Sequence, residues 1–174
     1  ISTKGGLEKP VFDGEFAHSG SYSPDGGKVI LNLGNFRWTR KAYKGSGDVD
    51  LWVFDKDLGS FERLTNTDTN DGWPMWSRDE DVVYFISERN GTRNLFEMSV
   101  KSKKAKQLTK HEDDGVLFPS VSKQSNRIVY SRGGKIWMLD ADSGQYNMVP
   151  IQIKSDSKNN WEVTTTFQRG ASEM

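Results

Sequence analysis

Residues 22–31 read Tyr-Ser-Pro-Asp-Gly-Gly-Lys-Val-Ile-Leu, and this turn followed by a strand decides the fold because it occurs again twice. Residues 75–85, Met-Trp-Ser-Arg-Asp-Glu-Asp-Val-Val-Tyr-Phe, align with it, and residues 119–130 align more loosely. In the first copy, Pro presets φ, Asp caps the backbone and Gly accepts a positive φ, which is the chemistry of a tight turn. The β-branched and aromatic residues after each turn are typical of strands buried on both faces.

Each unit continues with two more runs that resemble strands. The second runs are residues 50–55, 94–98 and 135–140, and the third runs are residues 61–65, 105–109 and 146–150. The second and third units follow at a spacing of 45 residues, measured from Ser77 to Ser122. The first unit is longer because of an insertion between Leu33 and Asp48. A period of roughly 40–45 residues with several short strands per unit predicts the blades of a β-propeller.

We therefore predict an all-β fold, a partial β-propeller with about three four-stranded blades and partial flanking blades. No window of a dozen residues shows an apolar stripe at helical spacing without Gly or Pro. Residues 1–11 resemble the last hairpin of a preceding blade, and residues 161–167 resemble the first strand of a following one. Because propellers usually close with about 4–8 blades, we expect the chain to be part of a longer protein.

Composition excludes several classes of function. The 174 residues carry 24 basic and 24 acidic side chains, so there is no basic excess of the kind that nucleic-acid binding requires. No run approaches the roughly 18 apolar residues of a membrane span. The absence of cysteine removes thiol catalysis, disulfides and cysteine-ligated metals. We expect no cofactor and no bound metal.

The repeats resemble those shared by TolB, tricorn protease and the relatives of prolyl oligopeptidase. The residues that carry this resemblance are 23–28, 63–65, 73–77 and 107–109. A closer similarity, to tricorn-type serine peptidases including bacterial tricorn-like proteins, rests on residues 87–96, 118–122, 134–137 and 149–153. In that family, a Val-Pro-Ile-like stretch follows the last blade of the first propeller.

The resemblance implies where the domains of the chain begin and end, and what each part of the parent protein does. Residues 1–149 would belong to the first propeller, and residues 150–174 to the junction with a following blade or second propeller. The parent protein would be a serine peptidase whose protease and PDZ-like domains lie elsewhere. This chain would be non-catalytic, and with the remaining blades and those domains it would guide or gate peptide substrates or mediate domain interactions.

Two alternatives stay open, a TolB-like propeller that binds proteins without enzymatic activity and the propeller of a dipeptidyl-peptidase-like enzyme. An oligomer would be one way to cover the open sheet edges. The resemblance to bacterial proteins favours the periplasm slightly over the cytoplasm, and the sequence itself decides neither.

Most polar motifs have an ordinary structural explanation. His18 and His111 lie beside residues typical of turns, and we interpret both as ordinary loop histidines. No Gly-x-Ser-x-Gly motif accompanies them, and we assign no catalytic residue. Residues 66–71 and 112–114 are acidic or amide-rich at equivalent positions, which favours turns between blades over a metal site because the spacing fails that of a calcium loop. Ser23-x-Asp25-x-Gly27 matches an Asp-box only in part, and we interpret it as turn chemistry.

Two basic segments remain. The lysines at 101–106 are interpreted as a solvated turn. The insertion contains two Arg, two Lys and three aromatic residues between 35 and 44. Long loops on a rigid scaffold often bind ligands, and Arg and aromatic residues are favoured contacts. The candidate binding residues are Arg37, Trp38, Arg40, Lys41 and Tyr43. The structural alternative is a hairpin extension that packs on adjacent blades.

Overall fold

The computed structural model describes residue 10, residues 16–35, residue 39 and residues 41–152. Twelve strands and no helix occur in this part of the chain, and it accordingly holds no helix that is long and apolar enough to cross a membrane. The predictions for residues 1–11 and 161–167 fall outside the described residues, apart from position 10. The all-β prediction is confirmed.

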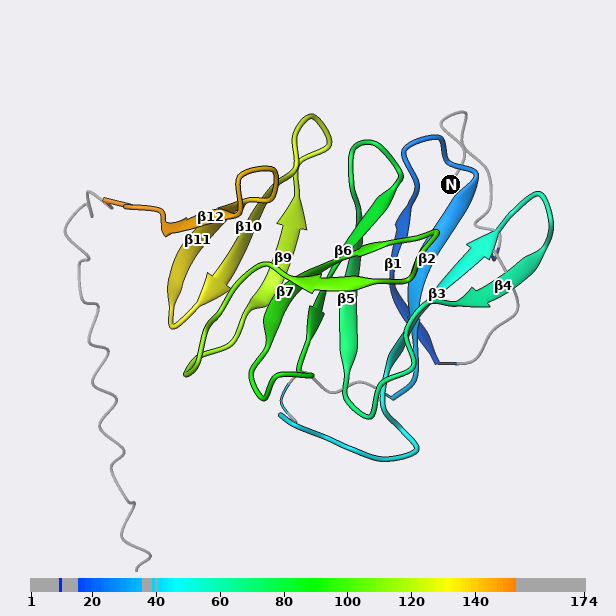
Figure 1. Ribbon diagram of the computed structural model, residues 1–174, viewed down its shortest axis with the longest axis horizontal. Helices are drawn as coiled ribbons and strands as arrows, with labels where there is room; N and C mark the ends of the chain where they lie inside the picture. Colours follow the sequence, from blue (N-terminus) through cyan, green and yellow to red (C-terminus); the bar gives the residue numbers. More distant parts are fainter. Residues whose placement is uncertain (1–9, 11–15, 36–38, 40, 153–174) are drawn as a thin grey trace, which may run out of the picture.

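The strands form three four-stranded antiparallel sheets, each built from strands consecutive in the sequence. Sheet 1 contains β1 (Ala17–Tyr22), β2 (Lys28–Leu33), β3 (Asp50–Asp55) and β4 (Ser60–Arg63). Sheet 2 contains β5 (Asp71–Trp76), β6 (Val82–Ser87), β7 (Asn94–Ser99) and β8 (Ala105–Gln107). Sheet 3 contains β9 (Leu117–Val121), β10 (Arg127–Arg132), β11 (Lys135–Asp140) and β12 (Gln145–Met148). Figure 1 shows the sheets side by side in sequence order, and we call them blades 1, 2 and 3.

The turn that repeats in the sequence has one geometry in all three blades. The backbone N–H of Ser23, Ser77 and Ser122 each donates to the carbonyl five residues later, at 2.9 Å in every case. In blade 1 the Asp25 carboxylate accepts hydrogen bonds from the Ser23 hydroxyl and the Gly27 N–H, which confirms the turn interpretation of this motif. Blade 3 closes the same turn although Asp and Gly are missing from it.

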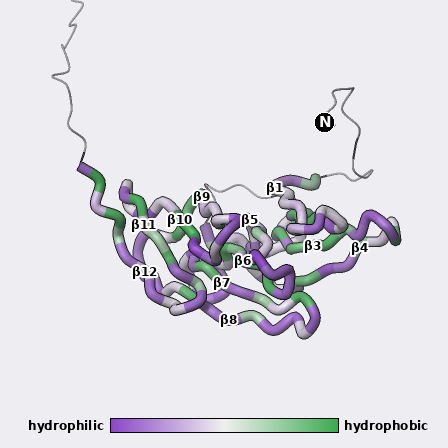
Figure 2. Tube along the Cα trace, turned by 90° about the horizontal axis from the view of Figure 1, so that it is seen from above, coloured by the Kyte–Doolittle hydropathy of each residue, from purple (hydrophilic) through white to green (hydrophobic). Residues whose placement is uncertain are grey.

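Apolar faces of adjacent blades supply the core. Between blades 1 and 2, Ile30 and Leu51 pack against Val83 and Phe85, and all four side chains are fully buried. A second cluster between blades 2 and 3 includes Tyr84, Leu95, Ile128, Tyr130 and Leu139. Figure 2 shows hydrophilic residues along β8, at the outer edge of blade 2. Burial between stacked sheets therefore explains why β2 and β6 carry continuous apolar runs.

Strand β10 departs from the prediction that these runs are buried on both faces. Ile128 and Tyr130 face blade 2 and are buried, whereas Val129, on the opposite face, is 44% exposed. The corresponding residue of blade 2, Tyr84, is only 3% exposed because blade 3 covers it. The described residues contain no sheet on the far side of blade 3, so β10 is buried on one face.

In blades 1 and 2, a buried threonine hydroxyl after the fourth strand is hydrogen-bonded to the start of the third strand. In blade 2 the Thr109 hydroxyl accepts the Leu95 N–H and donates to the Asn94 side chain, both at 2.9 Å. In blade 1 the Thr65 hydroxyl does the same with the Leu51 N–H and Asp50. Blade 3 carries Lys135 and Pro150 at these positions. Pro150 has neither a hydroxyl nor an N–H, so blade 3 cannot form the hydrogen bonds that the threonine makes in blades 1 and 2.

Candidate functional site

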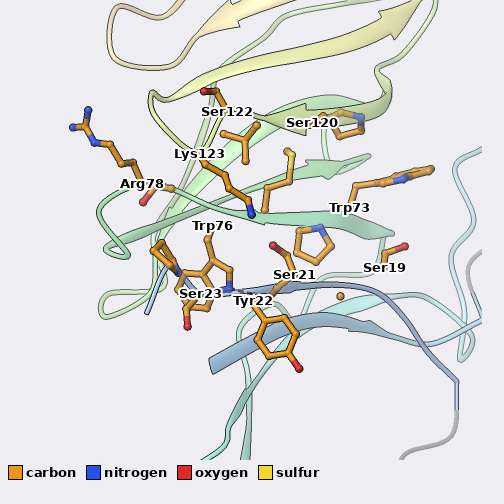
Figure 3. A pocket seen from close by; sticks show the side chains of 17 residues that line it. Ser19, Ser21, Tyr22, Ser23, Trp73, Trp76, Arg78, Ser120, Ser122 and Lys123 are labelled. Atoms are coloured by element: carbon orange, nitrogen blue, oxygen red, sulfur yellow. Dashed lines mark hydrogen bonds between the residues drawn. The ribbon is translucent and has the colours of Figure 1, made fainter. Parts of the chain in front are cut away.

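The inner strands of the three blades line one cavity of about 660 Å³. Its walls are residues 19–24 from blade 1, residues 73–78 from blade 2 and residues 119–123 from blade 3. Strand β5 contacts both β1 and β9, so the cavity follows the side on which the blades converge (Figure 3). This position corresponds to the central channel that a complete propeller encloses.

Each wall strand contains a bulge at the equivalent point. The pairing register shifts between His18 and Ser21 in β1, between Gly72 and Met75 in β5, and opposite Val129 and Ser131 in β9. The bulge residues Ser19, Trp73 and Phe118 have positive φ angles of 53°, 50° and 49°. A bulge leaves residues outside the ladder and redirects their side chains. The repeated bulges therefore interrupt the inner edge of every blade.

Two cationic residues, Arg78 and Lys123, lie at the end of the cavity where the first strand of each blade turns into the second, which we call the turn end. Arg78 points away from the opening, and Lys123 extends into the space between the strands (Figure 3). Arg78 forms a bidentate pair with Asp79, which raises the pKa of the guanidinium and lowers the pKa of the carboxyl. Arg78 and Lys123 are the charged members of the described lining, which contains no carboxylate. An anionic group would therefore meet no acidic neighbour among these residues.

Hydrogen bonds between turns hold this end together. The Asp25 N–H donates to the Glu80 carboxylate at 2.7 Å, which joins blade 1 to blade 2. The Arg78 N–H donates to the Asn126 side chain at 3.2 Å, which joins blade 2 to blade 3. The blades are thus fixed to one another beside the cavity, and its width is set by the scaffold.

The insertion lies at the other end, where β2 ends and β3 begins (Figure 1). The Ala42 N–H donates to the Glu88 carboxylate at 3.1 Å, and Ala42 adopts a positive φ of 52°. Glu88 is also paired with Arg93 at 2.9 Å and accepts a hydrogen bond from Asn70 at 3.1 Å. A buried carboxylate of blade 2 therefore anchors the insertion of blade 1.

The five predicted binding residues are only partly covered by the structure. Arg37, Trp38 and Arg40 lie outside the described residues. Lys41 is exposed, Tyr43 is half-buried, and neither belongs to the lining of the cavity. The contact with Glu88 agrees with the alternative of an extension that packs on an adjacent blade, and the binding role stays a prediction.

The prediction of loop histidines is wrong for His18 and confirmed for His111, although His111 is buried. His18 lies in β1 with Nδ1 3.3 Å from the Asn32 amide nitrogen. His111 lies in a connection but is only 7% exposed, and its Nε2 shares a 3.0 Å hydrogen bond with the Tyr130 hydroxyl. Burial, and secondarily the nearby Arg132, lowers the pKa of His111 to about 4. The His111 ring also contacts the rings of Tyr130, Trp137 and Tyr146, so blade 3 surrounds a neutral histidine with aromatic side chains.

The other polar segments have the structural roles that were predicted. Asn70 and Asp71 join blades 1 and 2, because the Val49 N–H donates to the Asn70 side chain at 3.3 Å and the Asp71 N–H donates to the Val49 carbonyl at 2.8 Å. Within blade 2, Asp71 also forms an ion pair with Arg89. The lysines at 101–106 lie in the exposed β7–β8 hairpin, where Lys103 pairs with Glu62 and Lys106 with Glu97. In the described residues no group of three or more His, Asp or Glu side chains is placed to hold a metal ion.

The cavity wall is a feature that was not predicted from the sequence. Trp73-Pro74 and Phe118-Pro119 are aromatic–proline pairs 45 residues apart, at the same place in consecutive repeats. Trp73, Pro74 and Pro119 line the cavity, and the alignment of the two pairs was the signal for it. The first strand of each blade was not predicted from the sequence, so it could not be known that these residues lie on the side of the channel.

Stacked four-stranded antiparallel sheets whose first strands converge on a shared cavity define the class of the protein, a β-propeller. The chain matches the tricorn protease N-terminal beta propeller domain over residues 1–145. It therefore belongs to that family, as the resemblance of its repeats had implied.

Individual relatives agree with this assignment. The chain is 30% identical over 118 residues to a tricorn protease homolog of Saccharolobus solfataricus, a match that covers 68% of this chain and 11% of the relative. It is 30% identical over 102 residues to tricorn protease homolog 1 of Streptomyces coelicolor, covering 58% and 9%. The chain thus spans about a tenth of the length of these curated relatives.

Solved structures support the fold. The tricorn protease structure superposes with a TM-score of 0.66 at 18% identity, over 79% of this chain and 13% of that one. A TolB structure from Agrobacterium tumefaciens gives a TM-score of 0.61 at 21% identity, over 73% of this chain and 46% of that one. Both are similar in fold to this chain.

Proposed function

We propose that this propeller segment is a non-catalytic wall of a peptide channel, which guides extended peptides toward a peptidase module in the parent protein. The cavity along the three inner strands is the observation that carries the proposal. Its wall offers hydroxyl groups at Ser19, Ser21 and Ser120, which can donate to or accept from peptide bonds. An extended segment can follow such a wall without forming a regular ladder, because the bulges interrupt the strand edges.

Lys123 gives the channel a direction in this proposal. Its side chain enters the lining and no acid of the described lining opposes it. A peptide's terminal carboxylate is the group that an ammonium in this position would attract, by a charge-assisted hydrogen bond. The peptide would therefore lie with its C-terminus toward the turn end of the cavity.

Peptide binding measured by fluorescence anisotropy tests this function. A fluorescein-labelled pentapeptide with a free C-terminus should bind more tightly than the same peptide amidated, by roughly three- to tenfold. Lys123→Gln should abolish this difference, while Lys104→Gln, the same change on the exposed β7–β8 hairpin, should leave it intact. Failure of the wild-type chain to bind either peptide would refute the channel function. The isolated chain should also hydrolyse neither peptide.

The insertion is a second contact in the proposal. We infer that Arg37, Trp38, Arg40, Lys41 and Tyr43 receive a peptide or a neighbouring domain, because the segment is rich in cations and aromatic residues. Replacing Arg37 and Arg40 together with Ala should weaken peptide binding without changing the melting temperature. If binding is unchanged, the insertion has a structural role only.

Domain interaction is the second candidate function, and an exposed face of blade 3 favours it. Val129, Ile136 and Met138 form this face and are 44%, 40% and 38% exposed. Val129 and Met138 are direct cross-strand partners. The equivalent residues of blade 2 include Tyr84 and Leu95, which blade 3 covers. We propose that a further blade of the parent protein covers the blade 3 face in the same way.

Met138→Arg tests the covered face by comparing two proteins. In the 174-residue chain the arginine would stand in water and should change stability by less than about 0.5 kcal/mol. In the full-length protein it would bury an unpaired charge and should cost about 3 kcal/mol or more. Gln124→Arg, on an exposed turn, should be neutral in both. Equal, small effects in both proteins would show that no blade covers the face.

A further inference from the structure

The turn between β6 and β7 contains the one Asn-Gly pair of the sequence, Asn90-Gly91. Asn90 is exposed. Apart from the chain neighbours of Gly91, no atom of the described residues lies within 4 Å of the point where a side chain on it would begin. Glycine has no Cβ that hinders the approach of the preceding side chain to its backbone nitrogen. The Asn90 amide carbon and the Gly91 nitrogen are therefore two groups that can react with each other where water reaches them.

The reaction between these groups is a substitution at the side-chain carbonyl carbon. The Gly91 nitrogen loses its proton and attacks Cγ of Asn90, a C–N bond forms, and the side-chain amide leaves as ammonia with that proton. The product is a cyclic succinimide. Water then opens the ring at either carbonyl, which gives aspartate or isoaspartate. Water is the co-reactant, and no group is oxidised or reduced.

Two hydrogen bonds of the folded blade oppose the first step. The Gly91 N–H donates to the Glu88 carbonyl at 2.8 Å, and this bond must open before the nitrogen can lose its proton. The Asn90 side-chain amide donates to the Gln107 Oε1 at 2.6 Å. Gln107 in turn donates to the Thr109 carbonyl at 2.7 Å, which fixes the orientation of its own amide. Strand β8 therefore holds the side chain that would otherwise move onto its own backbone.

We propose that Asn90 is a self-modification site, which the folded blade restrains and which reacts when the turn or its bond to Gln107 opens. Both products carry a negative charge, and isoaspartate also lengthens the backbone of the turn by a carbon atom. The turn closes on Glu88, whose carboxylate accepts the Ala42 N–H of the insertion at 3.1 Å. The modification would therefore fall beside the anchor of the insertion, and it is independent of the proposed channel function.

Other asparagines of the described residues lack one or both features of this site. Asn70, Asn94 and Asn126 are buried, and none of them precedes a glycine. Asn66 and Asn147 are exposed, but a threonine and a methionine follow them. Because a Cβ on the following residue crowds the attacking nitrogen, these two exposed asparagines serve as internal controls.

Peptide mapping by mass spectrometry after incubation in mildly alkaline buffer measures the conversion, because replacing NH₂ by OH changes the mass of the peptide. Asn90 should convert before Asn66 and Asn147. In urea both hydrogen bonds are absent, so the wild-type chain should convert at Asn90 at least about fivefold faster than when folded. Gln107→Ala should convert roughly two- to tenfold faster than the folded wild type, the factor that the loss of one hydrogen bond gives.

Lys106→Ala is the matched control on the same strand. Lys106 is exposed and pairs with Glu97 rather than with Asn90, so this variant should keep the wild-type rate. The urea comparison tests the restraint even if Gln107→Ala does not fold. Equal rates in the folded and unfolded wild type, or an unchanged rate in folded Gln107→Ala, would overturn the restraint by the blade. Absence of conversion at Asn90 in the unfolded chain would overturn the site itself.

Discussion

Two ion pairs in blade 2 have the same length and very different surroundings, which allows a controlled test of how the insertion is held. Glu88 pairs with Arg93 at 2.9 Å, and the side chains are 3% and 4% exposed. Glu97 pairs with Lys106 at the same 2.9 Å, with exposures of 24% and 73%. Glu88→Gln and Glu97→Gln therefore make the same substitution at a buried and at a partly exposed position.

Burial sets the expected magnitudes. Glu88→Gln leaves the Arg93 guanidinium without its counter-ion in a buried site, where its Nη2 already has no hydrogen-bond partner in the described structure. Breaking such a buried pair costs about 3–5 kcal/mol. Glu97→Gln should cost at most about 1 kcal/mol because the pair is solvent-screened. The difference is large against a typical total stability of about 5–15 kcal/mol.

Urea unfolding followed by tryptophan fluorescence measures both free energies of unfolding. A second readout is trypsin cleavage after Lys41, which precedes Ala42, the residue whose N–H Glu88 accepts. Glu88→Gln should accelerate this cleavage under native conditions, and Glu97→Gln should not. Losses of similar size in the two variants would refute the view that the buried carboxylate anchors the insertion.

Two further predictions concern buried polar groups. Thr109→Val should cost about 2–4 kcal/mol in urea unfolding, because it leaves the Leu95 N–H and the Asn94 side chain without the hydroxyl, while Thr109→Ser should keep most of the stability. In the folded chain, burial and Arg132 lower the pKa of His111 to about 4. As the pH falls, His111 therefore becomes protonated at a higher pH in the unfolded chain than in the folded chain. Stability should therefore decrease from about pH 6.5 down to about pH 4, and His111→Phe should show a shallower decrease in melting temperature over that range. A variant with the same pH slope as wild type would count against a neutral buried histidine.

The repeat and its turns could be predicted because their causes are local. Pro24 and the glycines that follow set a turn by their own backbone preferences, and the runs after the turns favour strands by side-chain shape. The inner strands were harder to assign. Strand β5 contains Gly72 and Pro74 and a bulge, so it lacks the alternation by which strands are recognised. His18 lies in such a strand, which is why it was expected in a loop.

The site could not be predicted because it is assembled from distant segments. Ser21, Trp76 and Lys123 share a wall only after three blades stack, and no local pattern encodes that stacking. The insertion was found from composition alone, whereas its anchor Glu88 looks like any other charged residue of a turn in the sequence. Burial of His111 likewise depends on its contact with Tyr130 from the next blade.

Hydrogen–deuterium exchange with and without the pentapeptide that has a free C-terminus tests most directly whether the three inner strands form a binding channel. Saturating peptide should slow exchange in the segments at 19–24, 73–78 and 119–123 together, and should leave the outer β3–β4 hairpin at 56–60 unchanged. Slowed exchange confined to the outer hairpins, or no change at any of the three wall segments, would contradict the account.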